Sequence, residues 1–153
     1  MKICAVFGHR QIDCANEIKV KLVDVIKRLI KDGVDTFYFG GLGQFDELCH
    51  SVVSELKEQY CNVKRVFCLY DERHVRESKR PKWLKDDDFE EFVFLPLKFA
   101  WWYKKIYYRN CAMIDDSDVA LFYVKKRENS GAYKTLKYAK KSKKTIINLF
   151  NNT

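Results

Sequence analysis

Glycine and polar residues that can bind a phosphate group are concentrated at four places in this 153-residue chain. They occur at residues 8–10 (Gly-His-Arg), 40–46 (Gly-Gly-Leu-Gly-Gln-Phe-Asp), 109–110 (Arg-Asn) and 130–135 (Ser-Gly-Ala-Tyr-Lys-Thr). Glycine lets the main chain approach an anion closely, and Arg, His, Asn, Ser and Thr side chains donate hydrogen bonds to it. The candidate ligand-binding residues are Gly8, His9, Arg10, Gly40, Gly41, Gly43, Asp46, Arg109, Asn110, Ser130, Gly131 and Thr135.

Asp46 and Arg109 are the candidates for catalysis in this set, and each has two interpretations. Asp46 precedes an amphipathic stretch and has the position of a helix N-cap, but its carboxylate can equally accept a hydrogen bond from a ribose hydroxyl. Arg109 either binds a phosphate or carboxylate group with its planar guanidinium, or forms an ion pair with Asp116 or Asp118. The sequence leaves both choices open.

Short apolar runs alternate with longer amphipathic stretches, which is typical of β-α units around a buried, mostly parallel sheet. Helices are expected between the first two runs, where apolar residues recur at helical spacing before Gly33, after Asp46, and over about 103–115 and 131–142. The six expected strands are Ile3–Phe7, Thr36–Phe39, Val63–Tyr70, Phe92–Leu95, Val119–Val124 and Thr145–Phe150.

These elements predict an α/β, Rossmann-like fold of three layers, with a mostly parallel sheet of five to six strands and helices on both faces. The carboxyl ends of parallel strands lie at one edge, and ligands bind there, where the strand order reverses. Five of the six glycines follow predicted strands, and the helices that come next present main-chain N–H groups to an anion. A nucleotide-type ligand is therefore expected at this edge.

The net charge of +8 is confined to the end of the chain. Residues 1–123 contain 20 basic and 20 acidic residues, whereas residues 124–153 contain 9 basic residues and only Glu128. Such local basicity favours a phosphate-bearing partner, either a nucleotide or a nucleic acid, although a solvated helix face has the same composition.

Length and composition exclude several classes of protein. The chain has the size of one domain, so a single domain over residues 1–153 is expected. No apolar run approaches the roughly 18–20 residues of a membrane span, and Ile3–Phe7 is too short for a secretory signal, so we expect a cytoplasmic protein without membrane contact. The six cysteines form no C-x-x-C pair and the three histidines no H-x-x-x-H pair, so neither a metal nor a cofactor is expected.

Two segments do not fit the alternating pattern. Asp71–Asp88 is highly charged and contains Pro81, which is typical of a long connection that serves either as a lid or as a surface insertion. Residues 99–103 (Phe-Ala-Trp-Trp-Tyr) continue into Tyr107 and Tyr108 as an aromatic cluster. Base stacking, a homodimer interface and core packing all remain open for it.

At these residues the chain resembles the SLOG superfamily, in particular its small bacterial YpsA-related members. The resemblance rests on four motifs in order: residues 8–10, residues 40–46, Arg109-Asn110-x-x-Met113 followed by residues 116–118 (Asp-Ser-Asp), and residues 130–135. It implies a Rossmann-like fold that binds a nucleotide or a nucleotide-derived ligand such as ADP-ribose or an NAD derivative. It further implies a homodimer and a role as sensor, effector or sequestering protein in nucleotide signalling or defence.

Two other branches of the superfamily suggest alternative functions. The LONELY GUY phosphoribohydrolases cleave N-glycosidic bonds with an Arg and a Glu. Matched by order, Arg109 takes the Arg position, but Tyr138 stands where the Glu belongs, so Asp46 is the remaining acid for such a reaction. The DNA-processing protein A family suggests binding of single-stranded nucleic acid by basic residues of the last helix. These residues are Lys134, Lys137, Lys141 and Lys144.

Overall fold

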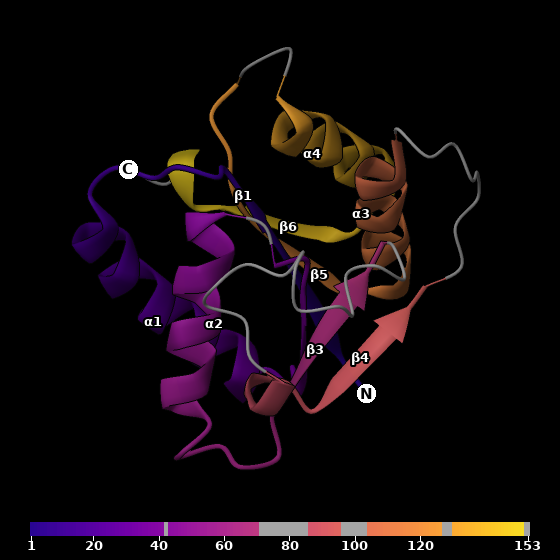
Figure 1. The fold of residues 1–153 in the computed structure, drawn as a ribbon. Coiled ribbons are helices and arrows are strands. Elements are labelled where there is room, and N and C mark those ends of the chain that lie inside the picture. The colour runs from indigo at the N-terminus through magenta and orange to yellow at the C-terminus, as the bar shows by residue number, and fades with distance from the viewer. Residues whose placement is uncertain (42, 71–85, 96–103, 127–129, 152–153) are drawn as a thin grey trace.

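The computed structural model describes the chain except residues 42, 71–85, 96–103, 127–129 and 152–153. Six strands and four α-helices alternate along the described residues (Figure 1). The strands are β1 (Ile3–Gly8), β2 (Thr36–Phe39), β3 (Lys64–Leu69), β4 (Glu91–Phe94), β5 (Val119–Tyr123) and β6 (Thr145–Asn148). The helices are α1 (Ala15–Lys31), α2 (Gln44–Leu56), α3 (Lys105–Asp116) and α4 (Gly131–Lys141), with short 3-10 turns at Asp86–Asp88 and Leu149–Asn151.

The strands form one sheet in the order β4-β3-β2-β1-β5-β6, and every pairing between neighbours is parallel. β1 pairs with β5 from Cys4↔Val119 to Gly8↔Tyr123, which places the ends of these two central strands at the same level. The predicted Rossmann-like α/β fold is therefore confirmed, and the sheet is parallel throughout these six strands rather than mostly so.

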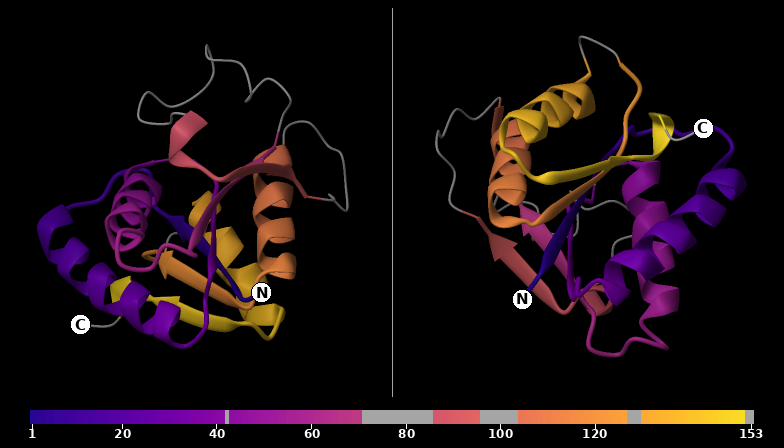
Figure 2. Two further views of the ribbon diagram at one scale, coloured as in Figure 1. Left: turned by 90° about the horizontal axis from the view of Figure 1, so that it is seen from below. Right: turned by 180° about the vertical axis from the view of Figure 1, so that it is seen from behind.

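Helices cover both faces of the sheet, as expected for three layers (Figure 2). One core cluster joins α1 and α2 to residues such as Val6, Phe37 and Leu121, and a second joins α3 and α4 to Ala5 and Phe122, whose side chains point to the opposite face. The alternation follows from the two-residue period of a strand. The buried residues of the central strands thus belong to one of two separate cores.

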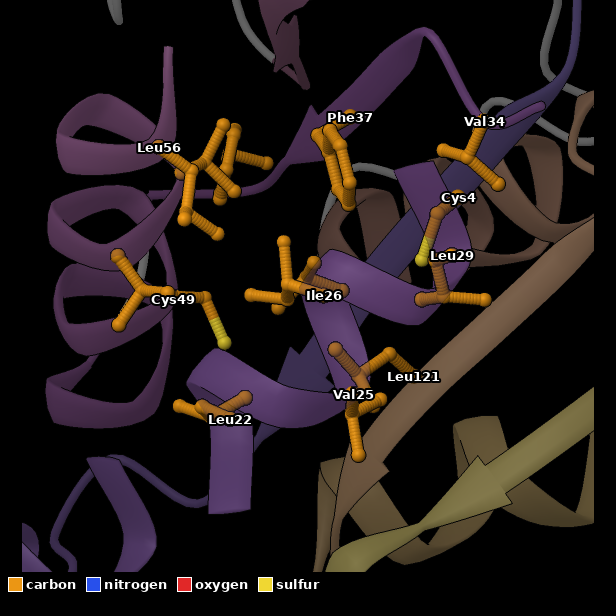
Figure 3. Packing of buried hydrophobic residues seen from close by; sticks show 14 of the residues in the cluster. Cys4, Leu22, Val25, Ile26, Leu29, Val34, Phe37, Cys49, Leu56 and Leu121 are labelled. Atoms are coloured by element: carbon orange, nitrogen blue, oxygen red, sulfur yellow. The ribbon is translucent and has the colours of Figure 1, made fainter. Parts of the chain in front are cut away.

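The apolar stripe of α1 behaves as its spacing predicts. Ile18, Leu22, Val25, Ile26 and Leu29 are buried, and Figure 3 shows four of them turned towards the core formed with α2 and the sheet. The helix ends just before Gly33, whose φ of 107° lies in the left-handed region that glycine adopts without strain.

The strand order reverses between β1 and β5, which lie side by side at the centre of the sheet. After β1 the chain enters α1 on one face, whereas after β5 it enters α4 on the other face. The two connections therefore diverge at the carboxyl edge and leave room for a ligand between them, as in other doubly wound sheets.

Several element boundaries differ from the sequence prediction. α2 begins at Gln44 with Gly43 as its N-cap, so Asp46 lies in the first turn and the N-cap interpretation of Asp46 is wrong. The last strand ends at Asn148 instead of Phe150, because the chain turns into a 3-10 segment. Of the expected connection Asp71–Asp88, residues 71–85 lie outside the described part, as do residues 99–103 of the aromatic cluster.

The described residues contain no helix that is long and apolar enough to cross a membrane. Within the same residues no group of three or more His, Cys, Asp or Glu side chains is arranged to hold a metal ion. All six cysteines are free thiols, and four of them are buried.

Candidate functional site

A cavity of about 290 Å³ lies at the carboxyl edge of the sheet, where the turns after β1 and β2 meet α3 and the start of α4. Val6, Phe7, Ile106 and Ala132 contribute its apolar lining. Nine of the twelve candidate ligand-binding residues also line it: Gly8, His9, Arg10, Gly40, Asp46, Arg109, Asn110, Ser130 and Gly131. Segments from all four sequence motifs thus meet at one cavity.

The other three candidates, Gly41, Gly43 and Thr135, do not line the cavity, and two of them contact residues that do. Gly41 and Gly43 have φ values of 73° and 100°, and a Cβ at Gly43 would lie 2.5 Å from the Cα of Arg10. Glycine at position 43 therefore allows the turns after β1 and β2 to touch, and the N–H of Gln44 donates to the carbonyl of Arg10 at 2.8 Å. Thr135 is fully buried, and its hydroxyl accepts a hydrogen bond from the Asn110 amide at 3.3 Å.

Arg109 is the largest polar side chain in the site and is only 1% exposed. Its Nη1 donates to the main-chain carbonyls of Gly40, at 3.1 Å, and Cys68, at 2.9 Å. Its Nε donates to the side-chain oxygen of Asn110 at 3.0 Å. These bonds fix the guanidinium between the ends of β2 and β3.

Neither of the two aspartates considered as ion-pair partners of Arg109 has that role. Asp118 accepts a hydrogen bond from the N–H of Ile3 at 2.9 Å, and Asp116 accepts one from the hydroxyl of Tyr38. Asp116 is the last residue of α3 and Asp118 follows the helix, so about two helical turns separate both from Arg109. The ion-pair interpretation of Arg109 is therefore wrong.

The second amino nitrogen of Arg109, Nη2, has no hydrogen bond among the described residues. Burial lowers the pKa of the guanidinium, and interactions with Cys68, Asp46 and Tyr70 act in the opposite direction. An arginine keeps its charge in such a setting. A buried cation with one nitrogen unsatisfied carries a desolvation cost that an anion in the cavity would relieve.

His9 links the turn after β1 to the turn after β5. Its main-chain N–H donates to the carbonyl of Tyr123 at 3.3 Å, and its Nε2 accepts a hydrogen bond from the N–H of Lys125 at 2.7 Å. Because Nε2 is an acceptor here, the ring proton is assigned to Nδ1. His9 therefore holds together the two diverging turns that border the cavity.

The start of α4 supplies main-chain donors. The hydroxyl of Ser130 caps the helix by accepting from the N–H of Tyr133 at 3.3 Å. The N–H groups of Gly131 and Ala132, both lining the cavity, precede the first intrahelical hydrogen bond. No acidic residue is present in this first turn, so the partial positive charge of the helix end is not offset within it.

Asp46 provides the acidic side chain of the cavity lining and is 5% exposed. It lies in the first turn of α2, and Arg10 and Arg109 line the same cavity. Two guanidinium groups and the end of α4 outweigh this single carboxylate, so the cavity is electropositive with one acceptor at its side.

The glycines of the site differ in the space that a side chain would have there. A Cβ at Gly40 would lie 2.6 Å from Nη2 of Arg109, and one at Gly8 would lie 2.5 Å from the Cβ of Phe45. By contrast, a Cβ at Gly131 would meet no atom within 4 Å, and Gly131 has no positive φ. Neither turn geometry nor packing within the described residues therefore requires a glycine at position 131, and its role in letting a ligand approach the main chain stays a prediction.

Four apolar residues of the lining were not among the candidate site residues: Val6, Phe7, Ile106 and Ala132. Ile106 lies three residues before Arg109, on the same face of α3, so the helical spacing alone was sufficient to find it. The contact between Arg109 and the carbonyl of Cys68 has no such signal, because it joins residues 41 positions apart.

Comparison with known proteins supports the fold and no more. No protein-family model matches the chain, and no curated protein is significantly similar to it in sequence. Among solved structures, the chain is similar to the X-ray structure of TM1055, a structural genomics target. The two share 19% sequence identity and a TM-score of 0.61, over 95% of this chain and 72% of that one.

Proposed function

We propose that the cavity binds a nucleotide or a nucleotide-derived ligand through one of its phosphate groups. The observation that carries this proposal is that Nη2 of Arg109, a 1%-exposed cation that lines the cavity, has no hydrogen bond to any described residue. Gly131 and Ala132 line the same cavity, and their N–H groups, which precede the first intrahelical hydrogen bond of α4, favour the same kind of ligand.

The remaining lining suits the rest of a nucleotide. Val6, Phe7 and Ile106 offer apolar surface to a base or to the carbons of a ribose. Asp46 is an acceptor that can bind a ribose hydroxyl, as a carboxylate does in dinucleotide-binding folds. ADP-ribose and NAD derivatives are the first candidates, and the protein would then sense such a ligand, transmit its presence or sequester it.

Isothermal titration with a nucleotide panel tests the proposal. ADP and ADP-ribose should bind, adenosine should not, and Arg109→Gln should weaken binding by roughly tenfold to hundredfold, the effect of losing a hydrogen bond to a charged group. Arg28→Gln is the matched control, because Arg28 is exposed on α1 and lies outside the cavity. Absence of binding to every member, or equal affinities in the wild type and Arg109→Gln, would refute the proposal.

Hydrolysis of an N-glycosidic bond is a second candidate. It is favoured by one observation: Asp46 lines the cavity with Arg109 and interacts with it electrostatically. In this reaction the bond from the anomeric carbon to the base breaks, the oxygen of water bonds to that carbon, and the proton that water loses is balanced by the one that the departing base gains. A carboxylate stabilises the oxocarbenium-like transition state. Chromatographic detection of a free base that is released by the wild type and by Asp24→Asn, but not by Asp46→Asn, would support it.

A further inference from the structure

A second depression of about 580 Å³ lies between α3 and α4. It shares Ile106, Asn110 and Gly131 with the cavity at the sheet edge, so the two spaces adjoin at the start of α4. We call it the α3–α4 groove. Its side chains beyond the shared residues are Lys104, Lys134, Lys137, Lys141, Tyr107 and Tyr138.

The positive charge of the α3–α4 groove is not neutralised by acidic side chains of its own lining, which contains none. Asp115, at the end of α3, accepts a hydrogen bond from the hydroxyl of Tyr138 at 2.7 Å. Among the described residues, neither Lys134 nor Lys141 takes part in a hydrogen bond or an ion pair. Charge of one sign therefore accumulates here and raises the local concentration of anions.

The spacing of these lysines matches an extended anion. Lys134, Lys137 and Lys141 are related by three and four residues, so they lie on one face of α4. From the first to the last they span about 10 Å along the helix axis. A single phosphate reaches only part of that length, whereas two linked groups can occupy both the cavity and the groove.

We propose that the ligand carries a second phosphate group, which binds in the α3–α4 groove while the first binds at Arg109. This inference rests on the proposed function, since it assigns the first phosphate to the cavity. The ligand class is then a nucleoside bisphosphate or a phosphodiester-linked dinucleotide. Tyr107 and Tyr138 would lie beside the second phosphate or, in a dinucleotide, beside the second base.

The test compares ligands that differ by one phosphate. Isothermal titration measures the affinities of four ligands for four proteins. The ligands are adenosine 5′-monophosphate, adenosine 3′,5′-bisphosphate, the dinucleotide pApA and an oligoadenylate decanucleotide. The proteins are the wild type, Lys134→Gln/Lys141→Gln, the charge-matched control Lys21→Gln/Lys31→Gln on exposed positions of α1, and Arg109→Gln.

The groove variant should lose roughly tenfold in affinity for the bisphosphate or the dinucleotide and less than about twofold for the monophosphate, as expected for two exposed ion pairs. The control should change neither. The loss of affinity that the groove variant shows for the two-phosphate ligands should be smaller at high salt, since exposed ion pairs are screened.

Four results would overturn the inference. Equal wild-type affinities for the monophosphate and the two-phosphate ligands would show that no phosphate binds in the groove. An equal loss of affinity for both kinds of ligand in the groove variant would show the same. A decanucleotide bound much more tightly than pApA would assign the groove to single-stranded nucleic acid instead. If Arg109→Gln weakens the monophosphate while the groove variant behaves as wild type, only this inference fails; if no ligand binds or Arg109→Gln changes nothing, the proposed function fails as well.

Discussion

The guanidinium of Arg109 occupies the space that a side chain at Gly40 would need. A Cβ at position 40 would lie 2.6 Å from Nη2, and the carbonyl of the same glycine accepts a hydrogen bond from Nη1 at 3.1 Å. The end of β2 is thus shaped around an arginine that comes 69 residues later in the chain. Position 40 therefore controls where the charged group of the cavity lies.

Gly40→Ala should displace the Arg109 guanidinium and weaken nucleotide binding. The added methyl group has no room, so the free energy of unfolding should fall by about 1–3 kcal/mol, the usual cost of overpacking. Urea denaturation and isothermal titration with ADP measure the two effects. Wild-type affinity in this variant would show that the position of Nη2 does not matter for the ligand.

Gly8→Ala and Gly131→Ala should differ although both glycines line the cavity. A Cβ at Gly8 would lie 2.5 Å from the Cβ of Phe45, a fully buried ring stacked on Tyr123, so this change should cost about 1–3 kcal/mol. A Cβ at Gly131 meets open space, and alanine suits a first helical turn, so the second change should be neutral or stabilise by up to ~1 kcal/mol. Equal losses in urea denaturation would contradict this assignment.

Arg109→Met should leave the ligand-free protein nearly as stable as the wild type while it abolishes nucleotide binding. Three hydrogen bonds are lost, but so is the desolvation cost of a buried cation, and the two terms have similar size. The free energy of unfolding should change by less than ~2 kcal/mol, as is typical of residues kept for function. A loss of about 3–5 kcal/mol, typical of a broken buried ion pair, would identify Arg109 as a structural residue.

Stability should fall as the pH is lowered from 7 towards 5, because of His50. Burial lowers the pKa of His50 from its ordinary value of 6.5; the main-chain carbonyl of Asp88, which accepts from Nε2 at 2.8 Å, acts in the opposite direction, and Arg65 lowers the pKa further. Below pH 6.5 the unfolded chain therefore binds a proton that the folded protein resists, and stability declines until the pH reaches the folded pKa.

His50→Gln tests this dependence, since glutamine does not titrate. Urea denaturation at pH 7 and pH 5.5 should show a smaller loss of stability in the variant than in the wild type. The pKa of Glu90 is lowered, because hydrogen bonds from Arg65 outweigh the effect of burial, so the contribution of Glu90 is lost only in more acidic solution. The same loss of stability in both proteins would exclude His50 as the cause.

The fold could be predicted from the sequence because the patterns that indicate it are local. The spacing of Leu22, Ile26 and Leu29 marks the buried side of α1, and each strand is a short apolar run. The edge at which the cavity lies followed from the same pattern, since parallel strands end together. Local periodicity thus predicted which residues would meet there.

The role of each residue in the cavity was harder to predict from the sequence, because that role depends on tertiary contacts. Both Gly43 and Asp46 are residue types found at helix N-caps, and only the φ of 100° at Gly43 and the contact of this turn with Arg10 decide between them. Two partners of Arg109 are the main-chain carbonyls of Gly40, just after β2, and of Cys68 in β3, and no residue pattern indicates them.

A crystal structure of the protein with bound ADP tests the central claim most directly. The proposed function predicts a phosphate oxygen within about 3 Å of Nη2 of Arg109, at hydrogen-bonding distance, with a further contact to the N–H of Gly131 or Ala132. ADP bound with its phosphates away from Arg109, or bound outside the cavity at the sheet edge, would contradict it.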